Sequence, residues 1–171
     1  MRKFIYLSIV ERLSELKNPD GEQLIKHFDL WNNNLEYIED EQPFNTPAVF
    51  VEFQSINWRY QANKLYNTDL VAIRLHIVTQ RNAPSAHNSE YEEHAIAFFD
   101  IIDLIRKTLI GFECKNETGV HGPLFNVQSD TDNNAAELRN DIEIFTCTAT
   151  DYSFVDEPKH WIAANIKINI E

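Results

Sequence analysis

Hydrophobic and polar positions alternate most clearly in the middle of the chain. Over residues 47–53, apolar side chains occupy every second position, which is the period of a β-strand. Residues 70–79 repeat this alternation, with Arg74 and His76 on the polar face. The polar segment 59–67 between them is too short for a parallel crossover, so the two strands are predicted to form an antiparallel hairpin.

Two segments have helical spacing instead. Residues 91–109 place apolar and charged side chains on opposite faces of an α-helix, and Gly111 follows, as glycine commonly does just past a helix end. Residues 3–17 show the same spacing and precede the turn-forming residues 18–21. Both helices need an apolar surface to lie on, and the hairpin supplies one.

Weaker patterns predict the remaining strands. Residues 25–31 and 124–127 are predicted as short strands, whereas residues 112–123 have no periodicity and are predicted as a loop. Residues 137–154 form a long predicted strand whose apolar positions change parity near Ile144. That change indicates a bulge or a strand that contacts different partners on its two faces.

The predicted fold class is α+β. We expect a mostly antiparallel sheet of about four to six strands, packed against a long central helix and an N-terminal helix. No repeat or linker divides the chain, so residues 1–171 are predicted to form a single α+β domain. Within it, residues 155–171 are a C-terminal strand extension, because isoleucines alternate with polar residues near the end.

Composition and charge narrow the partners. With 171 residues and 43% hydrophobic content, the chain can build one sizeable core. Its net charge of -12 opposes binding to nucleic acid or to an anionic membrane, although a local basic patch is compatible with it. We therefore expect neither sequence-specific nucleic-acid binding nor membrane binding.

Neither the start of the chain nor its two cysteines are typical of a secreted protein. Residues 1–10 resemble the start of a signal peptide, but Glu11 and Arg12 end the apolar stretch and no small-residue cleavage site follows. An amphipathic helix is therefore expected, and no apolar run approaches the roughly 18 residues that span a bilayer. Cys114 and Cys147 allow one disulfide at most, and two free thiols in a cytoplasmic protein are the expectation.

Candidate metal ligands occur before the strand at 47–53 and near the start of the helix at 91–109. Residues 36–41 contain four carboxylates, for which the alternatives are a solvated turn and a cation site. On a helix, Glu90 and His94 would share a face at a spacing of four, with His87 and Glu93 nearby. No zinc-protease signature is present, so a solvated helix start is expected.

A third candidate resembles part of a calcium loop. Asp130, Asp132 and Asn134 match its first three ligand positions. The match then fails, because Ala135 replaces the required glycine and Asp141 replaces the bidentate glutamate. We therefore expect no bound metal.

Nucleophilic and phosphate-binding motifs are absent from the sequence. No glycine-flanked serine elbow occurs, and four glycines leave little from which to build a phosphate-binding loop. His76 is expected to be a surface or intersubunit residue rather than a catalyst. The sequence therefore predicts no cofactor and no enzyme.

The predicted hairpin tip carries a candidate subunit interface. Aromatic and cationic side chains are enriched at binding hot spots, and here they are Trp58, Arg59, Tyr60, Lys64, Leu65 and Tyr66. They could equally pack back onto their own sheet. The same ambiguity applies to the C-terminal candidates Trp161, Ile166, Ile168 and Ile170.

The order of these elements resembles a known family. The resemblance is carried by the acidic run that ends in Gln42, Pro43 and Phe44 and by the segments 47–53, 73–79, 98–110 and 142–151. The chain resembles the tail-terminator, or tail-completion (head-to-tail joining), proteins of long-tailed bacteriophages. The resemblance covers nearly the whole chain, but residues 152–171 go beyond the shorter family members.

The resemblance implies a structural role without catalysis. It implies a homo-oligomer, typically a hexameric ring, that caps the tail tube and joins it to the head. The implied partners are tail-tube and head-connector proteins, and the implied location is the virion tail, assembled in the bacterial cytoplasm. An acidic ring fits the passage of DNA, because its lumen would not hold phosphate.

Two other function classes stay open. The first is a non-enzymatic binding module that uses residues 58–66 to hold a protein or a small ligand. The second is an enzyme of unrecognised type that depends on a metal held by Glu90 and His94.

Overall fold

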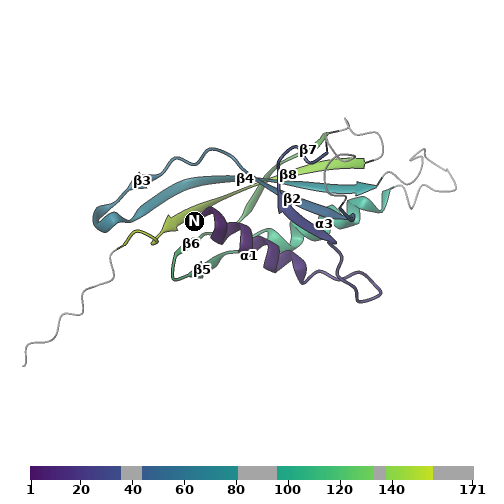
Figure 1. The fold of residues 1–171 in the computed structure, drawn as a ribbon, viewed down its shortest axis with the longest axis horizontal. Coiled ribbons are helices and arrows are strands. Elements are labelled where there is room, and N and C mark those ends of the chain that lie inside the picture. Colours follow the sequence, from purple (N-terminus) through teal and green to yellow (C-terminus); the bar gives the residue numbers. More distant parts are fainter. Residues whose placement is uncertain (36–43, 81–95, 133–137, 156–171) are drawn as a thin grey trace, which may run out of the picture.

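The described residues form a curled sheet of eight strands with two α-helices on one face (Figure 1). The structure is a computed structural model that describes residues 1–35, 44–80, 96–132 and 138–155. Because one pair of neighbouring strands is parallel and the others are antiparallel, the sheet is mixed, and it curls into a half-barrel.

Two long strands form the centre of the sheet. β4 (Tyr66–Gln80) and β8 (Leu138–Asp151) pair antiparallel, from Tyr66 opposite Asp151 to Gln80 opposite Leu138. They include the predicted strands at 70–79 and 137–154, which are confirmed. The remaining strands line the outer edges of this central pair.

Each long strand holds two shorter strands in succession on its outer edge. β4 pairs with β2 (Ala48–Phe53) and β3 (Arg59–Tyr60), whereas β8 pairs with β6 (Gly119–His121) and β7 (Phe125–Asp132). β1 (His27–Leu30) runs parallel to β2, and β5 (Cys114–Asn116) pairs with β6. The predicted antiparallel pairing of residues 47–53 with 70–79 and the short strand within 25–31 are therefore confirmed.

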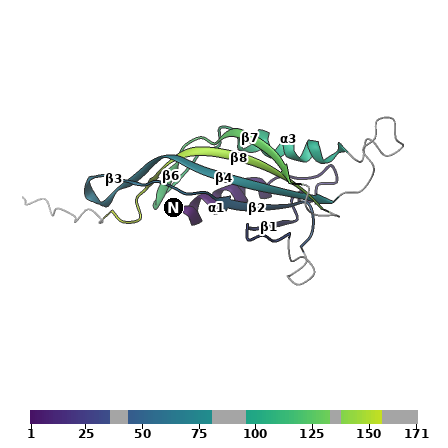
Figure 2. The same ribbon diagram turned by 90° about the horizontal axis from the view of Figure 1, so that it is seen from above.

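The two helices contact each other and cover the same face of the sheet (Figure 2). α1 (Arg2–Ser14) begins within one residue of the predicted helix start. α3 (Phe98–Leu109) ends before Gly111, whose φ is +78°. Apart from Phe145, the fully buried residues of this main core are aliphatic, and burying each large side chain contributes about 1.5–3 kcal/mol. They include Ile5, Ile9, Leu13, Ile105, Leu109, Ile73, Leu75 and Ile77.

A smaller apolar cluster lies on the opposite face of the sheet. Phe50 and Val78 are buried there, with Trp31 and Phe44 packed over them. β8 therefore contacts different layers on its two faces, and its register against β4 is continuous from Leu138 to Cys147. The bulge near this point lies in the neighbouring β7, so the parity change reflects two packed faces of β8 rather than a bulge in it.

The predicted fold class is wrong. Sheet dominates, with eight strands, and within the described ranges the α-helices are α1 and α3 alone, so no long central helix organises the fold. The predicted loop 112–123 contains β5 and β6, and β7 extends well past residue 127. Most residues of β5 and β7 are exposed, so no buried face imposes the alternation by which strands are recognised.

Several predictions fall outside the residues that the structure describes. They are the acidic turn 36–41, the start of the central helix at 91–95, and the C-terminal strand 161–170. Within the described residues, neither helix is long and apolar enough to cross a membrane.

Candidate functional site

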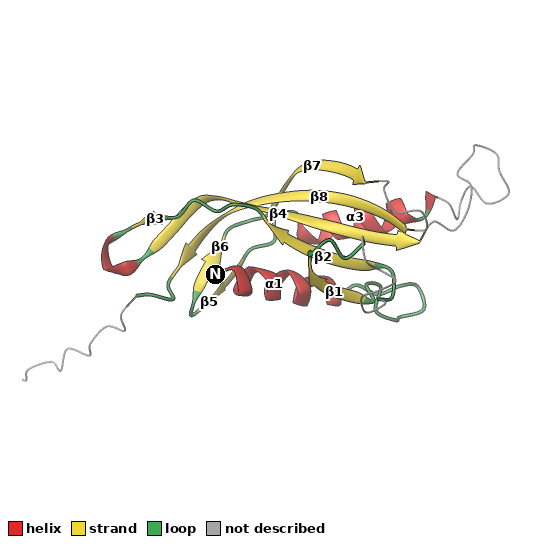
Figure 3. Ribbon diagram, turned by 45° about the horizontal axis from the view of Figure 1, so that its top comes forward, coloured by secondary structure: helices red, strands yellow, loops and turns green. Residues whose placement is uncertain are grey.

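A hairpin arm, residues 58–70, extends past the N-terminus of α1 (Figure 3). It consists of β3, a short turn of 3-10 helix (Ala62–Lys64) and the first part of β4. Asn63 and Lys64 turn the chain with φ angles of 62° and 61°, in the left-handed region. The arm therefore carries its aromatic and cationic side chains beyond the two helices.

A bulge in β4 separates the arm from the rest of the strand. The register of β4 against β8 shifts between Thr68 and Val71. The hydroxyl of Thr68 donates to the carbonyl of Leu70 at 3.1 Å and accepts from its N–H at 3.2 Å. Because a bulge bends a strand and increases its twist, it sets the direction of the arm.

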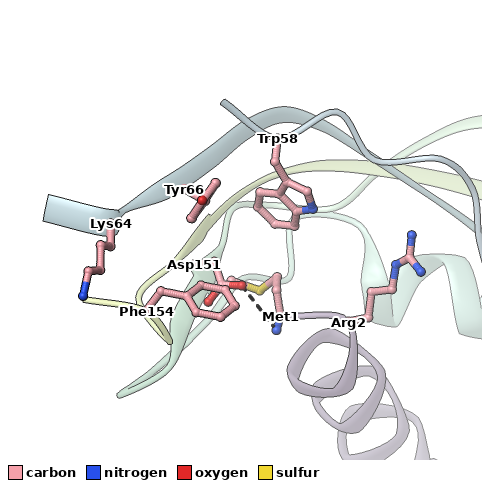
Figure 4. A pocket seen from close by; sticks show the side chains of 7 residues that line it. All are labelled: Met1, Arg2, Trp58, Lys64, Tyr66, Asp151 and Phe154. Atoms are coloured by element: carbon pink, nitrogen blue, oxygen red, sulfur yellow. Dashed lines mark ion pairs between the residues drawn. The ribbon is translucent and has the colours of Figure 1, made fainter. Parts of the chain in front are cut away.

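A pocket of about 640 Å³ lies between the arm, the start of α1 and the end of β8. This volume is within the range of about 300–1,000 Å³ that is usual for ligand sites. We call it the arm pocket, and its lining residues are Met1, Arg2, Trp58, Lys64, Tyr66, Asp151 and Phe154 (Figure 4). It draws on three separate parts of the chain.

Aromatic rings form much of the wall of the arm pocket. Tyr66 and Phe154 meet edge to face, with ring centroids 5.8 Å apart. Figure 4 shows these rings and Trp58 arranged around the side chain of Met1. Trp58 is half-buried and packs against the main core, so one side of the pocket wall is held by the fold itself.

Two cationic side chains line the arm pocket. Lys64 and Arg2 lie at opposite ends of it (Figure 4). The carboxylate of Asp151 lies 3.6 Å from the amino group of Met1 and accepts the N–H of Ser153 at 2.9 Å, so its negative charge is largely compensated. The pocket can therefore hold apolar side chains that have acidic groups beside them.

The structure brings only some of the predicted interface residues to this pocket. Trp58, Lys64 and Tyr66 line it. Tyr60 contacts Tyr66 edge to face at 5.5 Å, and Arg59 forms an ion pair with Asp69 at 2.6 Å, both on the exposed part of the arm.

The other predicted interface residues either do not line the arm pocket or lie outside the described residues. Leu65 is partly buried at the end of the arm turn and does not line the pocket. The C-terminal candidates Trp161, Ile166, Ile168 and Ile170 lie outside the described residues. Sequence reasoning missed Met1, Arg2, Asp151 and Phe154, because no local pattern relates the start of α1 to the end of β8.

The predicted metal candidates have no support among the residues that the structure describes. Asp130 and Asp132 lie on β7 and pair with β8, so they do not form a calcium-binding loop. Residues 87–94 and Asn134 lie outside the described ranges. Within those ranges, no three His, Cys, Asp or Glu side chains come close enough to bind a metal.

His76 is buried, which corrects its predicted place at the surface. Its ring stacks on Trp31 with centroids 3.7 Å apart and an interplanar angle of 2°. Asn140 Nδ2 can only donate, so His76 Nδ1 accepts at 3.2 Å and Nε2 donates to Glu52 at 3.3 Å. Burial lowers the pKa of His76, even though Glu52 opposes that effect.

A Ser–His pair lies in the core without the properties of a nucleophile. Ser8 Oγ lies 3.0 Å from Nε2 of His121, whose Nδ1 donates to the carbonyl of Gly122 at 3.0 Å. The carbonyl of Ile5, at 2.9 Å, is an alternative acceptor for the single proton of the same hydroxyl, and His121 is fully buried. Burial also lowers the pKa of His121, so the pair is a neutral polar link between α1 and β6.

The thiols give no reactive centre either. Cys114 and Cys147 are both free, as expected. Burial raises the pKa of Cys147 to about 12, which keeps it protonated and inert at neutral pH.

Neither protein-family models nor the curated proteins contain a match to this chain. The function proposed for it therefore rests on its sequence pattern and on the geometry of the arm and the sheet edges.

Proposed function

We propose that the chain is a structural, ring-forming subunit that completes the tail of a long-tailed phage or prophage. It would cap the tail tube and join it to the head, in the virion tail, after assembly in the bacterial cytoplasm. The observation that carries the proposal is the arm, which reaches past the helices and exposes 63% of Tyr60 and 56% of Leu70. Such side chains gain little within one copy and are available to a neighbour.

Open sheet edges support the same proposal. Within the described residues, β7 pairs with β8 alone and β1 pairs with β2 alone. An unpaired edge presents backbone donors and acceptors that another chain can use. Because the arm and the open edge are different surfaces, a contact between them joins subunits head to tail. Repeated contacts of this kind close into a ring where the rotation allows it.

The charge and the absence of reactive centres are consistent with this role. A net charge of -12 would keep a DNA passage from holding phosphate. The buried His121 and the protonated Cys147 leave the described part of the chain without an evident catalytic group. The proposed role requires none.

Mass measurement tests the proposal. Light scattering and native mass spectrometry should give a closed multiple of the 20.0 kDa subunit, alone or in the presence of tail-tube ends. Electron microscopy should then show rings, with six-fold symmetry expected from the family resemblance. A chain that stays monomeric and does not bind tube ends would refute the proposal.

The arm pocket favours a second candidate, a non-enzymatic binding module. Its apolar wall and two cations could hold a protein or a small ligand at residues 58–66. Exchange of Tyr60 and Trp58 for leucine separates the two candidates without a change of charge. The module predicts loss of ligand affinity with assembly unchanged, whereas the tail subunit predicts loss of assembly.

A further inference from the structure

We propose that the arm pocket of one copy receives the exposed edge of β7 from a second copy, so that subunits join head to tail. This inference rests on the proposed function and specifies the interface within the ring. The occupant is therefore a second copy of the same chain.

β7 exposes apolar side chains on an open sheet edge. Phe125 and Val127 are 57% and 58% exposed, near the start of the strand. Val127 is the extra residue at the bulge between Asn126 and Gln128, so it has no opposite residue on β8. Exposed apolar residues on an edge strand favour association, and a neighbouring subunit would cover them.

The same strand is acidic at its other end. Phe125, Asp130 and Asp132 lie opposite Thr146, Ile142 and Asn140, residues of one parity on β8. All three therefore share one face of the sheet. We call Phe125, Val127, Asp130 and Asp132 the β7 patch, in which an apolar part adjoins an acidic part.

The arm pocket has the complementary chemistry. Its rings, Trp58, Tyr66 and Phe154, offer an apolar surface, and Arg2 and Lys64 supply positive charge at its ends. Between copies that each carry a net charge of -12, long-range repulsion opposes association. A basic pocket offsets that repulsion locally and orients the acidic strand of the neighbour.

The two surfaces lie in different parts of the molecule. The arm pocket lies where the arm meets the N-terminus, whereas β7 lies over α3 toward the opposite end of the sheet (Figures 1 and 3). One copy therefore uses its pocket and its patch on two different neighbours. Repeated contacts of this kind form rings where the rotation closes.

Two double variants of the full chain test the pairing. The pocket variant carries Arg2→Glu and Phe154→Asp, and the first change also places a favourable acid in the first turn of α1. The patch variant carries Phe125→Lys and Asp130→Lys. The control is Leu7→Lys on α1, where Leu7 is 49% exposed. Circular dichroism and the thermal midpoint establish that each variant is folded.

Native mass spectrometry of each variant and of their mixture gives the decisive result. Each double variant alone should lose the ring and remain monomeric, and the control should assemble as the unchanged chain does. An equal mixture should form dimers of one copy of each variant and nothing larger, because only one pocket and one patch are intact per pair. Loss of assembly through misfolding would not produce that dimer.

The other outcomes separate this inference from the proposed function. If the unchanged chain forms rings and either double variant still does, the pairing is wrong and the proposed function stands. A mixture that stays monomeric also refutes the pairing of these two surfaces. If the unchanged chain is monomeric across a concentration series and with tail-tube ends, both proposals fail.

Discussion

The two halves of β4 have opposite surroundings within one continuous strand. From Val71 to Thr79, most side chains are buried, under the helices on one face and in the smaller cluster on the other. From Tyr66 to Leu70, the strand forms part of the arm, where Asp69 and Leu70 are exposed and only Thr68 is buried. Stability and the proposed contacts are therefore divided along a single strand, and the bulge marks the boundary.

The same substitution in the two halves should have very different costs. Leu75→Ala removes a fully buried side chain from the core and should lower the free energy of unfolding by about 2–5 kcal/mol. Leu70→Ala, on the arm, should change it by no more than about 0.5 kcal/mol. Urea unfolding of both variants measures the difference. Equal losses would mean that the arm is part of the stabilising core.

A smaller loss is expected at the polar link between α1 and β6. Ser8→Ala leaves the buried Nε2 of His121 without its donor, which should cost about 1–3 kcal/mol. Ser14→Ala is the matched control, because Ser14 lies on the same helix and is exposed. Urea unfolding should show little or no loss for the control. A similar loss in both variants would contradict the role of the link.

Acid should lower the free energy of unfolding through the two buried histidines, His76 and His121. Burial lowers the pKa of His76 and of His121 in the folded chain, so the unfolded chain binds more protons below its ordinary histidine pKa of 6.5. The free energy of unfolding should therefore fall as pH decreases below that value and level off below the folded pKa. Thermal midpoints between neutral and mildly acidic pH measure the slope.

The His76→Gln variant isolates one of these two groups. Glutamine keeps polar contacts to Glu52 and Asn140 in reach but does not titrate, so the decline of the thermal midpoint with acid should be shallower. Parallel curves for the variant and the unchanged chain would show that His76 does not contribute to the acid sensitivity.

The smallest effect is expected at the ion pair on the arm. Arg59 and Asp69 form a 2.6 Å contact, but both side chains are 69% exposed. Arg59→Ala should therefore lower the free energy of unfolding by less than about 1 kcal/mol, and salt should reduce the difference further. Asp69→Asn is the control for the other partner. A loss of unfolding free energy as large as that of Leu75→Ala would contradict the division between the exposed arm and the buried part of β4.

The periodic patterns in the sequence correctly predicted elements that pack an apolar face against the main core. The alternation in residues 70–79 and the helical spacing in residues 3–17 both correspond to side chains that enter the main core. β7 escaped prediction beyond residue 127 because it contacts the structure through polar groups. Asn126 and Ser129 donate to Glu143, both at 2.7 Å, and such contacts have no hydrophobic period.

The candidate site was predictable only in its local part. Trp58, Lys64 and Tyr66 stand within nine residues of one another, so an aromatic and cationic cluster could be recognised in the sequence. Arg2 and Phe154 come from opposite ends of the chain. The pairing of β8 with β4 places Phe154 beside the arm, and the packing of α1 on the main core places Arg2 there.

By itself, the sequence determined which segments bury an apolar face and how acidic the chain is. Local periodicity and side-chain charge require no knowledge of distant neighbours. Tertiary structure alone decided that the sheet curls, that His76 is buried under Trp31, and that the arm meets the start of α1 and the end of β8. These features depend on contacts between residues far apart in sequence, and such contacts form only when the whole sheet is assembled.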